Sequence, residues 1–424
     1  MSVKDPISLW DVSAEEENKP EEFSGDATAD VAIVGGGFTG LSTALHCAEK
    51  GLNAHVIEAE HIGYGGSGRN VGLVNASAWL PPKKVRETLG ATYGTRFVDT
   101  FSQAPECVFS LIEKHQIRCE VTKTGTLHAA HAPGGFRDLQ ERYDEWQRLG
   151  APVELLDRKE AAGKIGSDAF HGALQDNRAG TINPMGYCRG LARAARAAGA
   201  TISTGVRATR LIRAGDRWRL ETDKGTLTAK YVVLGTNAYT DDLWPDLKRN
   251  FTMIHFFQLA TGPLGEAVKN ILPERQGLWD TGQIMFSLRR DAFDRLVIGS
   301  MGRIVGSANS GLSHRWARKQ LNRLFPSLGA FEFEEAWHGQ IAMTPDHLPR
   351  IYNLAEGLYA PIGYNGRGIT TGTIFGKGMA DLLTGMDPSE LPLPISEAKT
   401  VASASIMSRY YEAAFTCNQL LKSI

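Results

Sequence analysis

The sequence lacks the features that would mark it as a membrane, secreted or nucleic-acid-binding protein. No stretch approaches the roughly 18 consecutive apolar residues of a membrane-spanning helix, and the polar, acidic residues 1–22 contain no apolar core of a secretory signal. Lys and Arg number 46 against 47 Asp and Glu, so no excess positive charge is present to attract nucleic acid or an anionic membrane surface. We expect a cytoplasmic protein with no nucleic-acid partner and no transmembrane segment; peripheral contact with the inner membrane stays open.

Cysteine is also scarce, and the cysteines are isolated from one another. None of Cys47, Cys107, Cys119, Cys188 and Cys417 falls in a CxxC pair, and their number is odd. This pattern argues against a zinc ribbon, a disulfide framework and a redox-active dithiol. We expect reduced thiols packed as small apolar side chains, and no metal site.

Length and one early stretch indicate the class of protein. A chain of 424 residues exceeds what a single core usually serves, so two domains are expected. Residues 29–40 read ADVAIVGGGFTG, an apolar strand that runs into a glycine-rich turn. Apolar residues then recur at helical spacing over 41–48, and AHVIEAE at 54–60 reads as a second strand. The order strand, turn, helix, strand predicts a βαβ unit of a parallel sheet.

The glycines of this unit have the spacing that dinucleotide binding requires. Gly35 permits a tight turn, Gly37 lets the backbone approach a pyrophosphate, and Gly40 lets the helix pack closely on the strand. The helix N-terminus supplies unpaired N–H groups and a partial positive charge. Glu58, near the end of the second strand, can accept hydrogen bonds from a ribose diol and would repel the 2′-phosphate of NADP.

Three later segments favour FAD over NAD. HIGYGGSGRNVG at 61–72 is a second glycine-rich loop, which the longer FAD molecule needs and an NAD domain does not. KYVVLGTNAYT at 230–240 reads as a buried strand ending in small polar residues, after a β-meander expected at 201–229. GLYAPIGYNGRG at 357–368 is a strand and loop before a helix, whose N–H groups can stabilise negative charge on a reduced flavin ring.

These four elements, in this order, resemble the D-amino-acid-oxidase / sarcosine-oxidase family of FAD-dependent amine oxidoreductases. The similar stretches are GYGGSGRNVG, VVLGTNAYT, WHGQIAMTPDHLPRI and LYAPIGYNGRG, and the resemblance covers about residues 28–390. Within the family the likeness is to bacterial oxidases of L-pipecolate and of γ-glutamylputrescine, and we favour L-pipecolate, whose product would be the cyclic imine. The resemblance implies a small-molecule amine or amino-acid substrate, and O2 or a respiratory-chain quinone as the electron acceptor.

The resemblance also implies an architecture. A Rossmann-type α/β FAD-binding domain, similar to that of p-hydroxybenzoate hydroxylase, would carry an inserted α+β substrate domain built on an antiparallel sheet. The FAD-binding domain would comprise residues 1–88, 157–243 and 338–424, and the substrate domain 89–156 and 244–337. Further expected elements are strands within 251–262, 282–290 and 295–301, amphipathic helices at 96–116 and 135–150, and a terminal helix over about 397–421.

In this family the FAD contacts come from all of the glycine-rich loops. The residues that the resemblance implies for the cofactor are Gly35, Gly37, Phe38, Thr39, Gly40, Glu58, Ala59, Ser67, Arg69, Asn70, Val206, Thr236, Asn237, Gly363, Gly366, Arg367, Gly368, Ile369 and Thr370. Covalent members carry a Cys where this chain has Gly339, so we expect noncovalent FAD. The adjacent His338 is the weaker candidate for a covalent link.

On the substrate side, the resemblance implies hydride transfer from a C–N bond to flavin N5, for which no side-chain base is obligatory. Sarcosine oxidases hold the substrate carboxylate with a Lys where this chain has Thr370, so a different cation is needed. The candidates are Arg367, which we favour because its loop should border the flavin, and Arg289, Arg69 and Arg303. Arg69 fits a role in supporting the cofactor better than one in holding the substrate.

Several uncharged or weakly charged side chains are further candidates for the catalytic pocket. They are Tyr364 at the flavin edge, His255 and Gln258 on one strand, and Met285 and Phe286 as an apolar wall. Core packing is the structural alternative for His255, Met285 and Phe286. Val297 stands where sarcosine oxidases carry an oxygen-activating Lys, which disfavours fast reaction with O2.

Other classes of flavoprotein fit less well. Flavin monooxygenases usually carry a late Gly-Asp pair, and PIGYNGRG contains no Asp. A pyridine-nucleotide-disulfide reductase needs a second GxGxxG and a redox CxxC. A non-catalytic or RNA-modifying FAD-binding protein stays open as a different class, although the balanced charge argues against tRNA.

Overall fold

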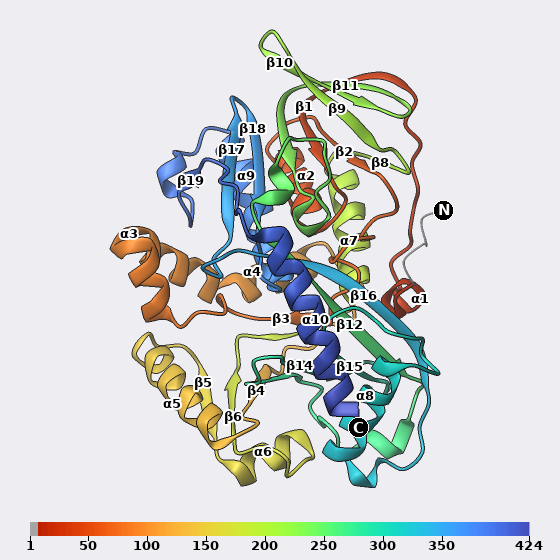
Figure 1. Ribbon diagram of the computed structural model, residues 1–424. Helices are drawn as coiled ribbons and strands as arrows, with labels where there is room; N and C mark the ends of the chain where they lie inside the picture. Colours follow the sequence, from red (N-terminus) through yellow and green to blue (C-terminus); the bar gives the residue numbers. More distant parts are fainter. Residues whose placement is uncertain (1–6, 424) are drawn as a thin grey trace.

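The computed structural model describes residues 7–423, which fold around two large β-sheets. The nine-stranded sheet lies in the upper half of Figure 1 and the eight-stranded sheet in the lower half. The main path of the nine-stranded sheet is, in pairing order, β19 (Ile395–Ser396), β17 (Arg350–Ala355), β18 (Leu358–Ile362), β11 (Gly225–Leu234), β1 (Gly25–Val34), β2 (Ala54–Glu58) and β8 (Thr201–Thr204). β9 (Ala208–Ala214) and β10 (Arg217–Thr222) extend from β11 as an antiparallel arm.

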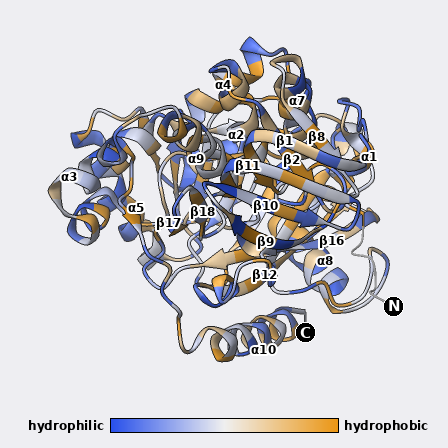
Figure 2. Ribbon diagram, turned by 90° about the horizontal axis from the view of Figure 1, so that it is seen from above, coloured by the Kyte–Doolittle hydropathy of each residue, from blue (hydrophilic) through white to orange (hydrophobic). Residues whose placement is uncertain are grey.

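The centre of this sheet is the expected βαβ unit. β1 pairs in parallel with β2 on one side and with β11 on the other. Val31 and Ile33 pack in the core under the helices α2 (Phe38–Glu49), α7 (Pro184–Ala197) and α9 (Gly368–Leu383). Ala32 and Val34 pack in the core on the side of the β9–β10 arm, so the strand is covered on both faces (Figure 2). Because both faces of β1 are buried, its residues are apolar at consecutive positions and do not alternate with polar ones.

The eight-stranded sheet is antiparallel except where β13 pairs with β4. In pairing order it contains β16 (Phe333–Met343), β12 (Thr252–Thr261), β15 (Leu296–Met301), β14 (Phe286–Arg290), β13 (Gly277–Asp280), β4 (Thr126–Ala129), β6 (Ala173–Asp176) and β5 (Val153–Leu156). β3 (Leu73–Val74) and β7 (Gly180–Thr181) form a separate small ladder. Further helices are α1 (Leu9–Ser13), α5 (Pro133–Arg148), α6 (Arg158–Ile165), α8 (Leu312–Leu324) and α10 (Ala404–Ser423). Short 3₁₀ turns lie at Asn237–Tyr239, Leu247–Arg249, Gly265–Val268, Pro326–Leu328 and Pro388–Glu390.

One expected helix is two helices in the structure. The segment 96–116 is shared between α3 (Pro82–Ser102) and α4 (Ala104–Lys114). Pro105, in the first turn of α4, has no N–H to continue the preceding helix, so α3 ends before it and α4 starts anew after Gln103.

Strand pairing crosses two of the expected domain boundaries. β6 lies within the expected FAD-binding segment 157–243, yet it pairs with β4 and β5 in the eight-stranded sheet. Residue 338 falls inside β16, which pairs with β12 along its whole length. The division into domains therefore stays a prediction, and its ends, 1–6 and 424, lie outside the described residues.

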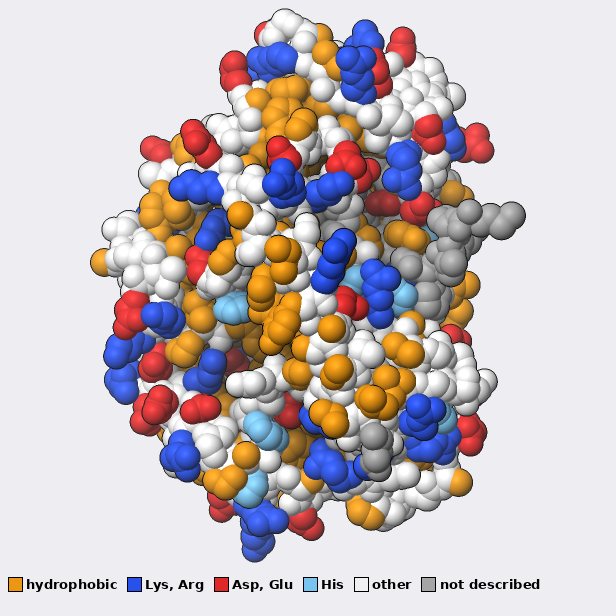
Figure 3. Space-filling view, in the orientation of Figure 1, with side chains coloured by type: hydrophobic (Ala, Val, Ile, Leu, Met, Phe, Trp, Pro, Cys, Tyr) orange, Lys and Arg blue, Asp and Glu red, His pale blue; other side chains and the backbone are white. Residues whose placement is uncertain are grey.

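The surface of the molecule in Figure 3 has an apolar stripe in its middle, over α10. Exposed side chains of α10 include Ile406, Tyr410 and Leu421. Between residues 7 and 423, no helix combines the length and the apolar character needed to cross a membrane.

Candidate active site

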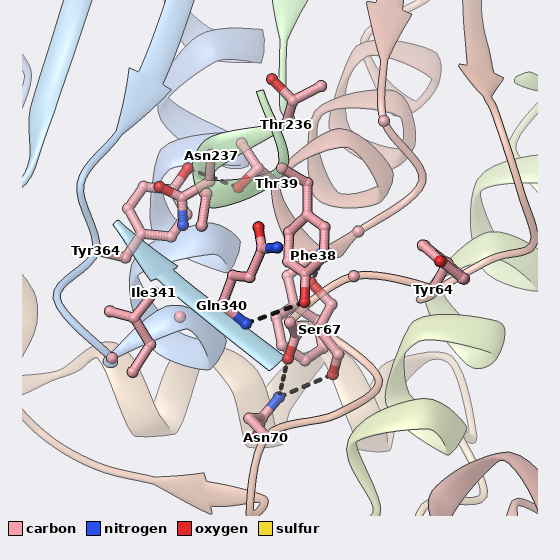
Figure 4. A pocket seen from close by; sticks show the side chains of 18 of the residues that line it. Phe38, Thr39, Tyr64, Ser67, Asn70, Thr236, Asn237, Gln340, Ile341 and Tyr364 are labelled. Carbon is pink, nitrogen blue, oxygen red and sulfur yellow. Dashed lines mark hydrogen bonds between the residues drawn. The ribbon is translucent and has the colours of Figure 1, made fainter. Parts of the chain in front are cut away.

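A cavity of about 520 Å³ is lined by residues of both sheets. The nine-stranded sheet contributes the carboxyl ends of β1, β2 and β11 and the N-termini of α2 and α9, and the eight-stranded sheet contributes β12, β13 and β16. The carboxyl edge of a parallel sheet is where such folds bind ligands. Figure 4 shows side chains from four separate segments meeting here, among them Thr39, Ser67, Asn237 and Tyr364.

The first glycine-rich turn is packed too tightly for larger residues. A Cβ at Gly40 would lie 1.9 Å from the carbonyl oxygen of Gly35, and a Cβ at Gly37 would lie 2.7 Å from Ser67 Oγ. Gly35 has φ 108°, a conformation that favours glycine. The N–H groups of Gly37 and Thr39 make no hydrogen bond with the described part of the chain, so they are available to a ligand in the cavity.

Glu58 is held at the end of β2 by the backbone. Its Oε2 accepts a hydrogen bond from the N–H of Gly36 at 2.6 Å, and its Oε1 accepts one from the N–H of Glu60 at 2.8 Å. Burial raises the pKa of Glu58, and these two hydrogen bonds oppose that rise. Each oxygen keeps a free lone pair for a ligand hydroxyl. Ala59 and Val206 line the cavity beside it.

The second glycine-rich loop faces the first. Ser67 Oγ accepts a hydrogen bond from the N–H of Phe38 at 3.1 Å, which joins this loop to the start of α2. Asn70 Nδ2 donates to the carbonyl of Ser67 at 2.8 Å, within the loop. Among residues 7–423 nothing accepts a hydrogen bond from the N–H groups of Gly65, Gly66 and Ser67. Three consecutive N–H groups on a cavity wall suit an anionic ligand such as a phosphate.

The N-terminus of α9 meets that of α2 at the same cavity. Tyr364 Oη lies 2.7 Å from Thr39 Oγ1, and Asn237 Oδ1 accepts a hydrogen bond from the N–H of Gly363 at 2.9 Å. The N–H groups of Gly368 and Ile369 are unused by the described chain. Two helix N-termini with unused donors therefore converge on one cavity (Figure 4).

These features fit the FAD that the resemblance implies. The expected cofactor residues that line the cavity are Gly35, Gly37, Phe38, Thr39, Glu58, Ala59, Ser67, Asn70, Val206, Thr236, Asn237, Gly366, Arg367, Gly368 and Ile369. The others do not line the cavity; they are Gly40, Arg69, Gly363 and Thr370. Arg69 donates to the carbonyls of Tyr64 at 2.7 Å and His338 at 3.3 Å, and so braces the second loop.

Arg367 lines the cavity and packs against two tryptophans that also line it. Its Cζ is 4.3 Å from the ring centroid of Trp79 and 4.9 Å from that of Trp279. Its Nε and Nη1 are buried, and no acceptor for them is present in the described chain. Burial, with the nearby charge of Arg142, lowers the pKa of Arg367 to about 9, so the guanidinium is still charged at neutral pH.

Strand geometry separates the expected pocket residues into two groups. Gln258 and Met285 line the cavity, whereas His255 and Phe286 do not. His255 contacts Glu412 of α10 at 2.7 Å, behind the sheet, and Phe286 stacks on Phe170 in the core. The side chains of strand residues an odd number of positions apart point to opposite faces, which accounts for the separation of His255 from Gln258 and of Phe286 from Met285.

The other candidate cations also lie outside the cavity. Arg289 is buried and donates to the carbonyls of Val71 at 3.2 Å and Ile182 at 2.5 Å. Arg303 is more than half exposed and pairs with Glu412. Val297 is buried in a small core away from the cavity lining.

The site residues that the sequence did not indicate are the tryptophans beside Arg367 and Gln340, whose backbone N–H donates to Tyr239 Oη at 3.1 Å. Trp79 donates to the carbonyl of Asn365, so its position depends on the loop before α9. Trp279 stacks on His128 at 4.9 Å between ring centroids. Both contacts join segments far apart in the chain, and no local pattern reports them. Within residues 7–423, no group of His, Cys, Asp or Glu is arranged to hold a metal ion.

Comparisons with known proteins agree with this geometry. The chain is 30% identical over 361 residues to γ-glutamylputrescine oxidoreductase of Escherichia coli, covering 84% of each chain. Its fold is similar to the crystal structure of glycine oxidase from Geobacillus kaustophilus, with a TM-score of 0.71 and 21% identity over 85% of this chain and 96% of that one. It is also similar to L-proline dehydrogenase from P. horikoshii, with a TM-score of 0.68 and 18% identity over 86% and 94% of the two chains.

A family model described as FAD dependent oxidoreductase matches residues 30–382. Together with the structural likeness, this match confirms the expected fold class: a parallel FAD-binding sheet combined with a largely antiparallel second sheet. It also implies FAD as the cofactor. The chain therefore belongs to the DAO family of FAD-dependent oxidoreductases, enzymes that oxidise amines and amino acids.

Proposed function

We propose that this protein oxidises the C–N bond of an amine that also carries a carboxylate, with noncovalently bound FAD, and that Arg367 holds the carboxylate. The observation that carries the proposal is an unpaired cation in the cavity. Two nitrogens of Arg367 are buried without an acceptor among residues 7–423, and a buried charge without a partner costs several kcal/mol. A substrate carboxylate would provide that partner.

The two tryptophans suit this role. The guanidinium of Arg367 lies over the rings of both Trp79 and Trp279, whose π-systems stabilise the positive charge. Nε and Nη1 of Arg367 have no acceptor in the described chain, and we expect an anion to pair with this guanidinium. A carboxylate has the matching geometry for two parallel hydrogen bonds.

The amine end of the substrate needs an acceptor, and Gln258 offers one. Its Nε2 donates to Ser287 Oγ at 3.3 Å, and its buried Oε1 has no donor in the described chain. We assign Oε1 of Gln258 to the N–H of the substrate amine. Met285 and Phe256 line the same part of the cavity and would exclude water from the reacting carbon.

The cofactor residues follow from the unused donors. When bound, FAD supplies the acceptor for the hydride equivalent that leaves the substrate carbon. The N–H groups at the start of α2 and in the second loop would bind the pyrophosphate, and those at the start of α9 would bind the pyrimidine edge of the flavin. Glu58 would bind the ribose of the adenosine.

The substrate is best identified by anaerobic reduction of the flavin. L-Pipecolate and γ-glutamylputrescine both carry an amine and a carboxylate; the sequence resemblance led us to L-pipecolate, and the relative from Escherichia coli supports testing γ-glutamylputrescine beside it. We expect bleaching of the flavin absorbance by one of them, and at least about tenfold slower bleaching by the matching amine without a carboxylate, such as piperidine for L-pipecolate. Equal rates with and without the carboxylate would contradict the proposal.

The same sample identifies the electron acceptor. After reduction by substrate, the flavin is exposed to air or to a soluble quinone, and the return of absorbance is followed. This chain has Val297 where sarcosine oxidases carry an oxygen-activating Lys, and this difference supports a quinone as the electron acceptor. Faster reoxidation by air than by the quinone would show instead that the enzyme is an oxidase.

A further inference from the structure

The second glycine-rich loop is held from behind through its carbonyl groups. Three consecutive carbonyls each accept a hydrogen bond from a large buried side chain. The contacts are Trp337 Nε1 to Arg69 O at 2.7 Å, Trp10 Nε1 to Asn70 O at 2.8 Å, and Arg289 Nη1 to Val71 O at 3.2 Å. The donors come from β16, α1 and β14, so three separate parts of the chain meet at this loop.

The three donor side chains also pack on one another. The rings of Trp10 and Trp337 meet edge to face with centroids 6.1 Å apart, and the guanidinium of Arg289 lies 5.0 Å from the centroid of Trp10. All three side chains are almost completely buried. This arrangement explains Arg289 without a substrate: its charge stabilises backbone carbonyls and an indole ring.

Trp10 belongs to an N-terminal segment with a fixed structure. α1 has only five residues, and a helix of that length is not stable alone. Ser8 caps it by accepting a hydrogen bond from the N–H of Asp11, and Ser8 Oγ lies 3.0 Å from the carbonyl of Gly68. Glu16, which follows, is buried and pairs with Arg193 of α7 at 2.8 Å.

This segment lies before residue 30, where the match to the family model begins. The contacts therefore connect a part of the chain outside the family match to a loop on the cavity wall. Because Asn70 lines the cavity and its carbonyl accepts from Trp10, a shift of that carbonyl would move the wall itself.

We infer that Trp10 is a positioning residue for the cofactor: with Trp337 and Arg289 it fixes the carbonyls of residues 69–71, and so holds the unused N–H groups of residues 65–67 against the FAD. Without the indole N–H, the carbonyl of Asn70 would be buried and unsatisfied, and the loop would relax to reach water. The inference rests on the proposed binding of FAD by this loop.

The test is a comparison of two tryptophan-to-phenylalanine variants. Apoprotein of Trp10→Phe is titrated with FAD, and binding is followed by quenching of flavin fluorescence. We expect the Kd for FAD to rise about tenfold or more, the scale of one lost buried hydrogen bond. Trp316→Phe is the matched control, because Trp316 is equally buried and its Nε1 has no partner in the described chain. It should leave the Kd for FAD unchanged.

A second variant and a second measurement keep the test independent of folding. Trp337→Phe removes the neighbouring donor and leaves the N–H of Trp10 in place, and it should also raise the Kd for FAD. The visible circular dichroism of bound flavin should change in both variants and not in Trp316→Phe. If Trp10→Phe and Trp337→Phe bind FAD as tightly as Trp316→Phe, Trp10 has no positioning role. If wild-type protein binds FAD but no carboxylate-bearing amine reduces it, the proposed function fails and the positioning role stands.

Discussion

The guanidinium of Arg367 packs against two indoles, those of Trp79 and Trp279, and these contacts restrict its rotation. Trp79 is itself fixed by Asn365, and Trp279 by His128. A long cationic side chain usually loses conformational entropy when it binds a ligand, and this loss lowers its affinity. A guanidinium whose rotation is already restricted loses less. The selectivity of the site for a carboxylate should therefore depend on the stacking as well as on the charge.

Replacing Arg367 should separate substrate binding from cofactor binding. For Arg367→Ala we expect the KM for a carboxylate-bearing amine to rise about 10²-fold, equivalent to about 3 kcal/mol for a bidentate charged pair, with near-normal flavin content. Arg367→Lys should recover only part of the loss, because a lysine keeps the charge without the planar fork. Steady-state kinetics would measure both. Arg303→Ala, outside the cavity, is the control and should leave KM unchanged. Loss of FAD from Arg367→Ala would instead assign the residue to the cofactor.

Glu58 should contribute to FAD affinity through its two fixed oxygens. Glu58→Ala removes the carboxylate that would accept hydrogen bonds from the ribose. It also removes the acceptor of the N–H groups of Gly36 and Glu60. We expect FAD binding to weaken by about 1.5–3 kcal/mol, the scale of hydrogen bonds to a charged group. Titration of apoprotein with FAD measures the change. Unchanged affinity would remove Glu58 from the cofactor site.

Among individual residues, the sequence predicted those of the cofactor site better than those of the substrate site. Glu58 and the glycines follow from a local spacing with a known physical reason. His255 and Phe286 could have been separated from Gln258 and Met285 by strand alternation alone, since each pair differs by an odd number of positions. The places of the tryptophans beside Arg367 could not have been predicted from the sequence, because they depend on contacts between distant segments.

At the scale of elements, the site depends on how closely two helices approach. α2 and α9 pack through glycines: a Cβ at Gly372 would lie 3.0 Å from Phe38 Cβ, and a Cβ at Gly376 would lie 2.4 Å from Ser42 Cβ. This close approach brings both N-termini to one cavity. A wider separation would move the flavin-facing N–H groups of α9 away from those of α2.

Gly376→Ala should therefore destabilise the protein by about 1–3 kcal/mol, the usual cost of overpacking. Gly378→Ala on the same helix is the matched control. Its Cβ would meet only the side chain of Leu391, at 3.2 Å, and alanine favours a helix over glycine by about 1 kcal/mol. Urea unfolding of the two apoproteins measures the difference. If Gly376→Ala left the free energy of unfolding unchanged, α2 and α9 could move apart without cost.

The attachment of α10 to β12 should make stability depend on pH. Burial acts to raise the pKa of Glu412, but the hydrogen bond from His255 and the charge of Arg303 outweigh it and lower that pKa below its usual range. A carboxyl with a lowered folded-state pKa stabilises the fold above its unfolded value, about 4.3, and loses that contribution as pH falls through the folded value.

Glu412→Gln should accordingly flatten the acid limb of the stability curve. Wild type should lose more unfolding free energy than the variant as pH falls from about 6 to below about 4. Urea unfolding at each pH measures this. Parallel curves across the acid range would mean that the pair with His255 does not contribute.

For the whole molecule, the order of elements along the chain was predictable and the boundaries between its two sheets were not. The βαβ unit, the meander and the late strand-loop-helix each carry a local signal, and the family resemblance placed them in one fold. β6 carries none: its four residues pair with β4 and β5 in the eight-stranded sheet, although they follow α6 and precede α7, which covers the other sheet. Such crossing of the chain between sheets is a non-local property.

Noncovalent attachment of the cofactor stays a prediction, which concerns residues of β16 and is tested on the whole molecule. Position 339 is a glycine, so it offers no thiol to a flavin, and a Cβ there would lie 2.5 Å from the ring of Phe256. His338 turns toward His255, with ring centroids 6.0 Å apart, behind the sheet. The free cysteines of the described chain, Cys47, Cys107, Cys119, Cys188 and Cys417, do not line the cavity.

We therefore expect acid precipitation to release all the flavin into the supernatant, and the refolded apoprotein to bind FAD again. Because residues of both sheets line the cavity, FAD should stabilise the molecule as one unit. At a free concentration of about 100 times Kd, the gain in unfolding free energy should be about 2.7 kcal/mol, seen as a single melting transition that moves to higher temperature. Flavin that stays with the precipitated chain would mean a covalent link. Two transitions, of which FAD moves only one, would mean that the cofactor binds one sheet alone.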